Sequence, residues 1–207
     1  MRQKTKGSGN LESSWMGRPN MKTAIASVLV AACISANASA MSIELRGERG
    51  DPRRVIHLEG DIKPGDVKRI RKVIADLRKR HEVLRGFVIM NSPGGEVLES
   101  FYLMDLFANT QLPILIKGDC LSACGFIAAG LAATGNLYLD ETAAVAVHRV
   151  YDLHGRDDLQ ASLEAAQMLA EDGVPPSIVY KIVSTSSTRL SDITGDLRLM
   201  LATRVRN

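Results

Sequence analysis

The chain has 207 residues and a mass of 22.5 kDa, which is enough for one compact domain with or without a short additional segment. Hydrophobic residues make up 45% and charged residues 24% of the sequence, values typical of a globular protein rather than a disordered or fibrous one. Three cysteines are too few for a disulfide-rich scaffold. The net charge of +3 comes from the first 40 residues, because residues 41–207 hold 21 basic and 22 acidic residues. A basic surface that binds nucleic acid is therefore not expected.

Residues 1–40 have the pattern of a leader followed by a secretory signal peptide. Lys22 precedes a run of small and apolar residues, and the run ends in an A-x-A cleavage site at Ala38–Ala40. The apolar run, about 13 residues, is shorter than the roughly 20 that span a bilayer, so a permanent anchor is the weaker interpretation. We expect cleavage after Ala40, one mature domain over residues 41–207, and a periplasmic or secreted protein.

Cys33 leaves a second route of processing open. The segment Val30–Cys33 is similar to the lipobox of bacterial lipoproteins, in which the cysteine becomes a lipidated N-terminus. The alternative is that Cys33 is one more small residue of the apolar run. Either route places the rest of the chain in an oxidising compartment.

Strands and helices are predicted to alternate along the remainder of the chain. Apolar and β-branched runs predict strands at residues 54–58, 86–90, 113–116, 136–139 and 143–150. Apolar residues at helical spacing predict helices at residues 64–80, 95–108, 122–133 and 157–171, and Pro175-Pro176 opens another. This alternation predicts parallel β-α-β units in a single α/β domain.

The first strand-to-helix junction whose residues could take part in binding or catalysis is the loop Asn91–Val97 (NSPGGEV). Pro93 fixes its own φ, and Gly94 and Gly95 allow backbone conformations closed to other residues. The helix expected to begin at Gly95 would direct free N–H groups beyond the end of the preceding strand. Such a loop can bind an oxyanion, although a Pro-Gly-Gly sequence is also common in simple turns.

The second junction is Gly118–Gly125 (GDCLSACG), which places Ser122 at the start of a helix. A serine there is usually an N-cap, whose hydroxyl accepts a hydrogen bond from the first turn. The same position suits a nucleophile, because the helix dipole favours an alkoxide-like oxygen and the next N–H can hold an oxyanion. His148, at the end of an apolar strand, is either a structural histidine or the base that this nucleophile needs.

In combination, the segment Asn91–Gly95, Ser122 and Val147-His148 resemble the proteolytic subunit of the Clp protease. More broadly, they are similar to the Clp protease/crotonase superfamily, and Leu58–Ile62 resembles the opening unit of that superfamily. The resemblance covers about residues 54–151. It implies a spiral α/β fold of stacked β-α-β units.

Carried over position by position, the resemblance makes Ser122 the nucleophile and His148 the general base. It assigns the oxyanion hole to the backbone N–H groups of Gly95 and Ala123. The third member of the triad would lie beyond residue 151, where the similarity ends. Spacing favours Asp192 or Asp196, but the local sequence does not reproduce the family motif, so an incomplete triad is the other possibility. A histidine without a carboxylate partner lacks its usual orienting group.

Two functions from different classes follow from these residues. The first is an exported serine peptidase that hydrolyses peptide bonds in a peptide or protein substrate through Ser122 and His148. The second is a catalytically inactive binding or scaffold protein of the periplasm with the same fold. No cofactor is expected, and acyl-CoA chemistry is disfavoured because an exported protein meets little coenzyme A. A homo-oligomer is also expected, since the small residues around Ala128–Gly130 would allow close packing.

Cys120 and Cys124 bracket Ser122, which distinguishes this chain from the Clp subunit. Four residues apart across a strand-to-helix turn, their α-carbons can approach to the ~4.4–6.8 Å that a disulfide needs. The alternative is a pair of buried free thiols. No metal site is expected, because two thiolates without a nearby histidine fill only half of the usual zinc shell. A disulfide here would clamp the turn that carries Ser122.

Overall fold

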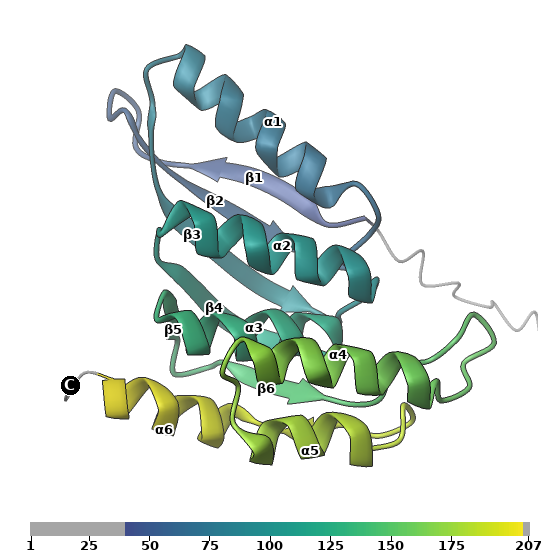
Figure 1. The fold of residues 1–207 in the computed structure, drawn as a ribbon. Coiled ribbons are helices and arrows are strands. Elements are labelled where there is room, and N and C mark those ends of the chain that lie inside the picture. The colour runs from purple at the N-terminus through teal and green to yellow at the C-terminus, as the bar shows by residue number, and fades with distance from the viewer. Residues whose placement is uncertain (1–39, 205–207) are drawn as a thin grey trace, which may run out of the picture. The chain divides into compact units, whose positions relative to one another are not determined.

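Residues 40–204, the part of the chain that the computed structural model describes, form seven strands and six helices. They form one mixed α/β domain built on one sheet (Figure 1). The predicted leader and signal peptide, and the candidate lipidation site Cys33, lie outside the described residues.

The strands are β1 (Ser42–Arg46), β2 (Arg53–Glu59), β3 (Val83–Ser92), β4 (Ile114–Leu121), β5 (Leu137–Leu139), β6 (Ala144–Val147) and β7 (Ser191–Asp192). The helices are α1 (Asp66–Lys79), α2 (Val97–Thr110), α3 (Ala123–Thr134), α4 (Leu159–Glu171), α5 (Pro176–Ser184) and α6 (Thr194–Arg204). All five predicted helices and all five predicted strands are present, whereas β1, β7 and α6 were not predicted.

The centre of the sheet is parallel, as the alternation of strands and helices predicts. Strands β2, β3, β4 and β6 run parallel in that order, while β1 and β7 pair antiparallel at the two ends. One edge of β4 pairs first with β5 and then with β6. The carboxyl ends of β3, β4 and β6 therefore meet at the same edge of the sheet, and the candidate residues follow them.

Three predicted boundaries are corrected by the structure. The strand expected at residues 113–116 continues to Leu121, because its second half pairs with β6 after the chain bends at Gly118, where φ is +68°. The helix expected from Gly95 begins at Val97, because φ is +135° at Gly95. The strand expected at residues 143–150, which is β6, ends at Val147, so His148 follows it in a loop.

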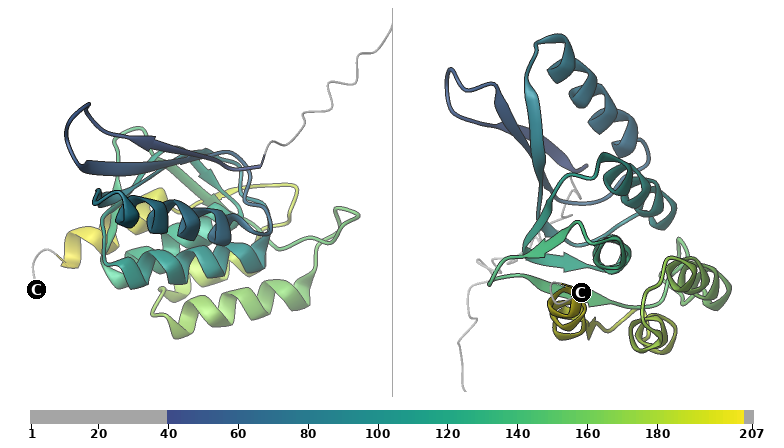
Figure 2. Two further views of the ribbon diagram at one scale, coloured as in Figure 1. Left: turned by 90° about the horizontal axis from the view of Figure 1, so that it is seen from above. Right: turned by 60° about the vertical axis from the view of Figure 1, so that its left-hand side comes forward.

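Helices α1, α2 and α3 cover one face of the sheet, and α4 and α5 pack against each other beside α3 (Figures 1 and 2). Alternate residues of the central strands point into this layer and are fully buried: Ile56, Leu58, Phe87, Ile89, Ile114 and Ile116. Phe107 of α2 meets Phe87 with ring centroids 4.8 Å apart. This core fixes the ends of the strands from which the site is built.

The small-residue helix α3 packs inside the domain rather than at its surface. All residues from Ala123 to Ala132 are buried, and a Cβ on Gly130 would lie 2.0 Å from the sulfur of Met104 on α2. The small side chains are therefore explained by close packing of α3 against α2. The expected homo-oligomer stays a prediction, without this helix as its support.

Within residues 40–204, no helix is both long enough and apolar enough to cross a membrane.

Candidate functional site

Ser122 occupies the sharp turn between β4 and α3. Its φ of 56° and ψ of −122° are unusual for a residue with a side chain, and such strain persists only where the surroundings enforce it. The backbone is fixed on both sides, because its N–H donates to the Ala146 carbonyl at 2.8 Å and its carbonyl accepts from the Phe126 N–H at 3.2 Å. A strained turn of this kind presents the serine oxygen at the end of the sheet.

The hydroxyl of Ser122 is not used as a helix cap. Ser122 stands at the N-cap position of α3, but its side chain makes no capping hydrogen bond. Nor does its Oγ hydrogen-bond to any other group within residues 40–204. Ser122 therefore does not stabilise the start of α3 through its hydroxyl, which was the structural alternative to a nucleophile.

The Gly94-Gly95 loop lies directly against this turn. A Cβ on Gly94 would lie 2.6 Å from the Leu121 carbonyl oxygen and 2.7 Å from the Ser122 Cβ, so only glycine fits here. On the far side, the Ile62 N–H donates to the Gly94 carbonyl at 2.7 Å and the Glu96 N–H donates to the Ile62 carbonyl at 3.0 Å. The loop is thus held between the turn and residue 62.

These contacts leave two backbone N–H groups beside Ser122 without acceptors. On the parallel bridge between Ile62 and Gly95, the neighbours of Gly95 make the hydrogen bonds, so its own N–H faces away from Ile62. Neither this N–H nor that of Ala123, the first residue of α3, has an acceptor within the described residues. Two free donors beside a serine are what an oxyanion site requires.

His148 follows β6 and is 7% exposed. Its Nδ1 lies 2.6 Å from the backbone carbonyl of Arg149, and its ring stacks on Tyr151 with centroids 5.7 Å apart. Because a carbonyl can only accept, this hydrogen bond requires the proton on Nδ1. In the neutral ring Nε2 then carries the lone pair and can accept a proton.

Ser122, Gly95 and His148 line one cavity of about 630 Å³. Its walls also contain apolar side chains, namely Ile62, Val97, Phe126, Val150 and Leu153. Leu153 belongs to the loop between β6 and α4, and this loop projects beyond the sheet (Figure 1). The sequence-predicted serine, histidine and glycine thus lie around one space large enough for a peptide side chain.

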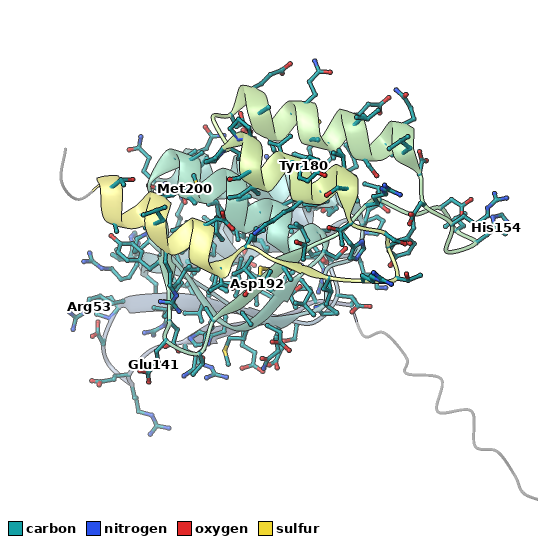
Figure 3. The ribbon with its side chains drawn as sticks, turned by 90° about the horizontal axis from the view of Figure 1, so that it is seen from below. Arg53, Glu141, His154, Tyr180, Asp192 and Met200 are labelled. Atoms are coloured by element: carbon teal, nitrogen blue, oxygen red, sulfur yellow. A yellow bond between two sulfur atoms is a disulfide. The ribbon has the colours of Figure 1, made fainter. Side chains whose placement is uncertain are left out.

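The two aspartates favoured by spacing do not reach His148. Asp192 accepts hydrogen bonds from Thr194, which lower its pKa, and it ends β7, just before α6 (Figure 3). Asp196 pairs with Lys181 at 2.8 Å. Within residues 40–204, no carboxylate forms a hydrogen bond or ion pair with the His148 ring. The expected segment does approach the histidine, but through Ser187 and Thr188, which line a second hollow beside it.

Sequence analysis missed a group of residues that surround His148. The Arg149 guanidinium pairs with Asp157 at 3.0 Å, and Asp157 also accepts from the Ser187 N–H at 2.8 Å. Lys63, which also lines the cavity, is paired with Asp61 at 3.1 Å. No local pattern marks these residues, because each acquires its place through contacts between segments far apart in the chain.

The sulfur atoms of Cys120 and Cys124 lie 2.04 Å apart, at disulfide-bonding distance, with their α-carbons 5.1 Å apart. Both residues are fully buried, one in β4 and the other in the first turn of α3. The proposed clamp therefore spans the turn that carries Ser122. Among the described residues, no cluster of histidine, cysteine or acidic side chains could hold a metal ion.

Comparison with known proteins adds only a distant likeness in fold. No family model matches the chain, and no curated protein matches it. Among solved structures, a mutant of the 1510-N membrane-bound stomatin-specific protease is similar, with a TM-score of 0.49 and 13% sequence identity. The match covers 70% of this chain and 74% of that one. A likeness this distant assigns no role to any residue of this chain.

Replacing Gly94 by alanine is expected to damage the turn at Ser122 more than positive φ alone explains. Gly173→Ala is the matched control, because φ is +87° there and nothing lies within 4 Å of the place that a Cβ would take. The control should lower the free energy of unfolding by about 1–2 kcal/mol, and Gly94→Ala by about 3 kcal/mol or more, since the methyl group meets backbone atoms. Urea unfolding measures both, and equal losses would contradict the close contact.

Reduction of the Cys120–Cys124 pair is expected to loosen the turn more than the rest of the fold. A loop this short contributes about 2 kcal/mol to global stability through chain entropy, less than a longer loop would. We expect a mild reductant to speed amide exchange in residues 119–126 more than in α1. The Cys120→Ala/Cys124→Ala double variant should not respond to the reductant. Alkylation of both cysteines in the unreduced protein would show that no clamp exists.

The Asp157 carboxylate is expected to stabilise the fold in a pH-dependent way. Hydrogen bonds from Ser187, and then from Arg149, lower the pKa of Asp157 from 3.8 to about 2. The ionised group therefore contributes fully above about pH 4, and this contribution is lost as the pH falls towards 2. Asp157→Asn should lower the thermal midpoint at pH 7 and have progressively less effect between pH 4 and pH 2. A loss that is unchanged across this range would exclude the ionised carboxylate as its cause.

Proposed function

We propose that the protein is an exported serine peptidase of the Clp protease/crotonase type, with Ser122 as nucleophile and His148 as general base. The observation that carries the proposal is the strained turn at Ser122, a serine whose hydroxyl caps no helix and which lines one cavity with His148. A purely structural serine gains nothing from such strain, whereas a nucleophile gains exposure and alignment. The spiral arrangement of β-α-β units is part of the same proposal.

The proposed chemical steps use Ser122, His148 and two backbone N–H groups. His148 Nε2 takes the proton from Ser122 Oγ as the oxygen attacks the carbonyl carbon of the scissile bond. The negative charge that develops on the carbonyl oxygen is held by the N–H groups of Gly95 and Ala123. The leaving amine takes the proton from His148, and water then hydrolyses the acyl-enzyme by the same route in reverse. Each oxyanion donor typically contributes about 10²–10³ in rate.

Export is proposed together with this activity. A buried cysteine pair at disulfide-bonding distance suits an oxidising compartment such as the periplasm or the extracellular space. The apolar lining of the cavity favours a peptide or protein substrate with an apolar side chain next to the cleaved bond.

A second candidate is a binding or scaffold protein that uses the same cavity without catalysis. One observation favours it, namely that no carboxylate within the described residues orients His148. In serine proteases this partner contributes orders of magnitude to the rate. The two candidates differ in whether Ser122 reacts.

Labelling with a fluorophosphonate probe separates the two candidates. We expect the mature protein to take up one probe molecule, and Ser122→Ala and His148→Ala to lose labelling. Ser177→Ala, which removes an exposed serine from the first turn of α5, serves as the control and should label normally. Folding of each variant is checked by circular dichroism.

A folded protein that takes up no probe, or one that labels equally after Ser122→Ala, would remove the peptidase proposal in favour of the binding protein. Incubation of the labelling-competent protein with a peptide library, read by mass spectrometry, then tests whether peptide bonds are cleaved. We expect cleavage next to apolar residues and none by Ser122→Ala.

A further inference from the structure

The hydrogen bond from His148 reaches the carbonyl of the very next residue, so it depends on the backbone conformation of Arg149. A carbonyl in a loop is free to rotate unless its residue is held by more than one contact. Arg149 is held by three contacts. Its N–H donates to the Thr185 carbonyl at 2.9 Å, its Nε donates to the Val183 carbonyl at 2.7 Å, and its guanidinium pairs with Asp157 at 3.0 Å.

The partners of Arg149 are themselves held in place. Asp157 accepts from the Ser187 N–H at 2.8 Å, which ties the start of α4 to the segment after α5. The next residue, Val150, donates its N–H to the buried Ser162 hydroxyl at 2.9 Å and accepts from the Asp158 N–H at 2.8 Å. Two segments of the chain, residues 157–162 and residues 183–185, therefore converge on the two residues that follow His148.

The side chain of Arg149 is paired with one carboxylate, that of Asp157. The side chains of Arg149 and Asp157 are 30% and 26% exposed, so their pairing is partly shielded from water. A pair of this kind, with a planar fork that also binds a main-chain carbonyl, orients more firmly than an exposed lysine would. The pair therefore fixes the orientation of Arg149 and does not only neutralise its charge.

We propose that the Arg149–Asp157 pair is a positioning device for His148. It holds the Arg149 carbonyl against Nδ1, which fixes the proton on that nitrogen and leaves the Nε2 lone pair towards the cavity that contains Ser122. The main-chain carbonyl takes the orienting role that a carboxylate has in a Ser-His-Asp triad. The catalytic consequence of this inference rests on the proposed function, but the fixed tautomer does not.

A carbonyl differs from a carboxylate in one respect that matters for the rate. It orients the neutral ring, but it stabilises the positive imidazolium less, because it carries no full charge. The site should therefore react more slowly than a complete triad and still faster than one in which the ring is free to turn. This reconciles a well-formed turn at Ser122 with the absence of a carboxylate at His148 among the described residues.

The first test reads the tautomer of His148 without any use of activity. Nitrogen-15 NMR at pH 9 distinguishes the two nitrogens of each neutral histidine, and the His148→Gln variant identifies the signals of His148. We expect one tautomer with the proton on Nδ1 in the wild-type protein. Asp157→Asn and Arg149→Gln should give a mixture of both tautomers.

The second test reads the reaction of Ser122 with the fluorophosphonate probe, with reversible binding and the first-order labelling step measured separately. Asp157→Asn should slow the labelling step about tenfold to a hundredfold, since small misplacements of a reacting group cost this much. Its reversible binding of the probe should not change. A merely structural defect would weaken both.

The matched control is Asp51→Asn, which removes the Asp51–Arg53 pair from the β1–β2 connection, away from the cavity. It should keep both the wild-type tautomer and the wild-type labelling rate. If Asp157→Asn fails to fold, Arg149→Gln carries the test.

A mixture of tautomers in the wild-type protein, or a single Nδ1–H tautomer in both variants, would overturn the positioning role. A wild-type protein that shows the fixed tautomer but takes up no probe would support the positioning device and remove the proposed peptidase. The two proposals therefore fail by different observations.

Discussion

The site depends on one close approach, that of the Gly94 backbone to the turn at Ser122. There is no room for a side chain between them, since a Cβ on Gly94 would lie within 2.9 Å of three atoms of that turn. A second close approach of this kind occurs at Gly125, in the first turn of α3, where a Cβ would lie 2.6 Å from the Ala146 carbonyl oxygen. Loop, helix and strand therefore meet through backbone atoms, and this contact places two unpaired N–H groups beside the serine.

Much of this arrangement could be predicted because its signals are local. An apolar strand followed by small residues and a helix predicts the junctions at Gly94 and Ser122, and the spacing of Cys120 and Cys124 predicts their contact. The length of β4 could not be predicted, because its second half is polar and glycine-containing and forms a strand only by pairing with β6. The short β7 likewise exists only through its pairing with β6.

The surroundings of His148 could not be read from the sequence for a different physical reason. The segment after α5 was expected to supply an aspartate side chain, whereas it contributes mainly backbone atoms, the Thr185 carbonyl and the Ser187 N–H. Backbone groups are the same in every residue, so no residue type marks them. The aspartate that does participate, Asp157, comes earlier in the chain and acts on the neighbour of the histidine. Reasoning from spacing points to Asp192 and Asp196, whereas the groups of this segment that bond to Arg149 and Asp157 are backbone atoms.

The strain at Ser122 explains why so many constraints converge on one turn. A residue with a side chain in this region of φ and ψ costs about 1–3 kcal/mol, and it would relax if either flank were free. Neither flank is free. The N–H of Ser122 donates to the Ala146 carbonyl, and α3 is buried along its first ten residues. Cys120 and Cys124 also join the two flanks. Since the cysteine pair spans the strained residue itself, a bond between the two sulfur atoms holds the geometry of the serine locally, apart from any contribution to overall stability.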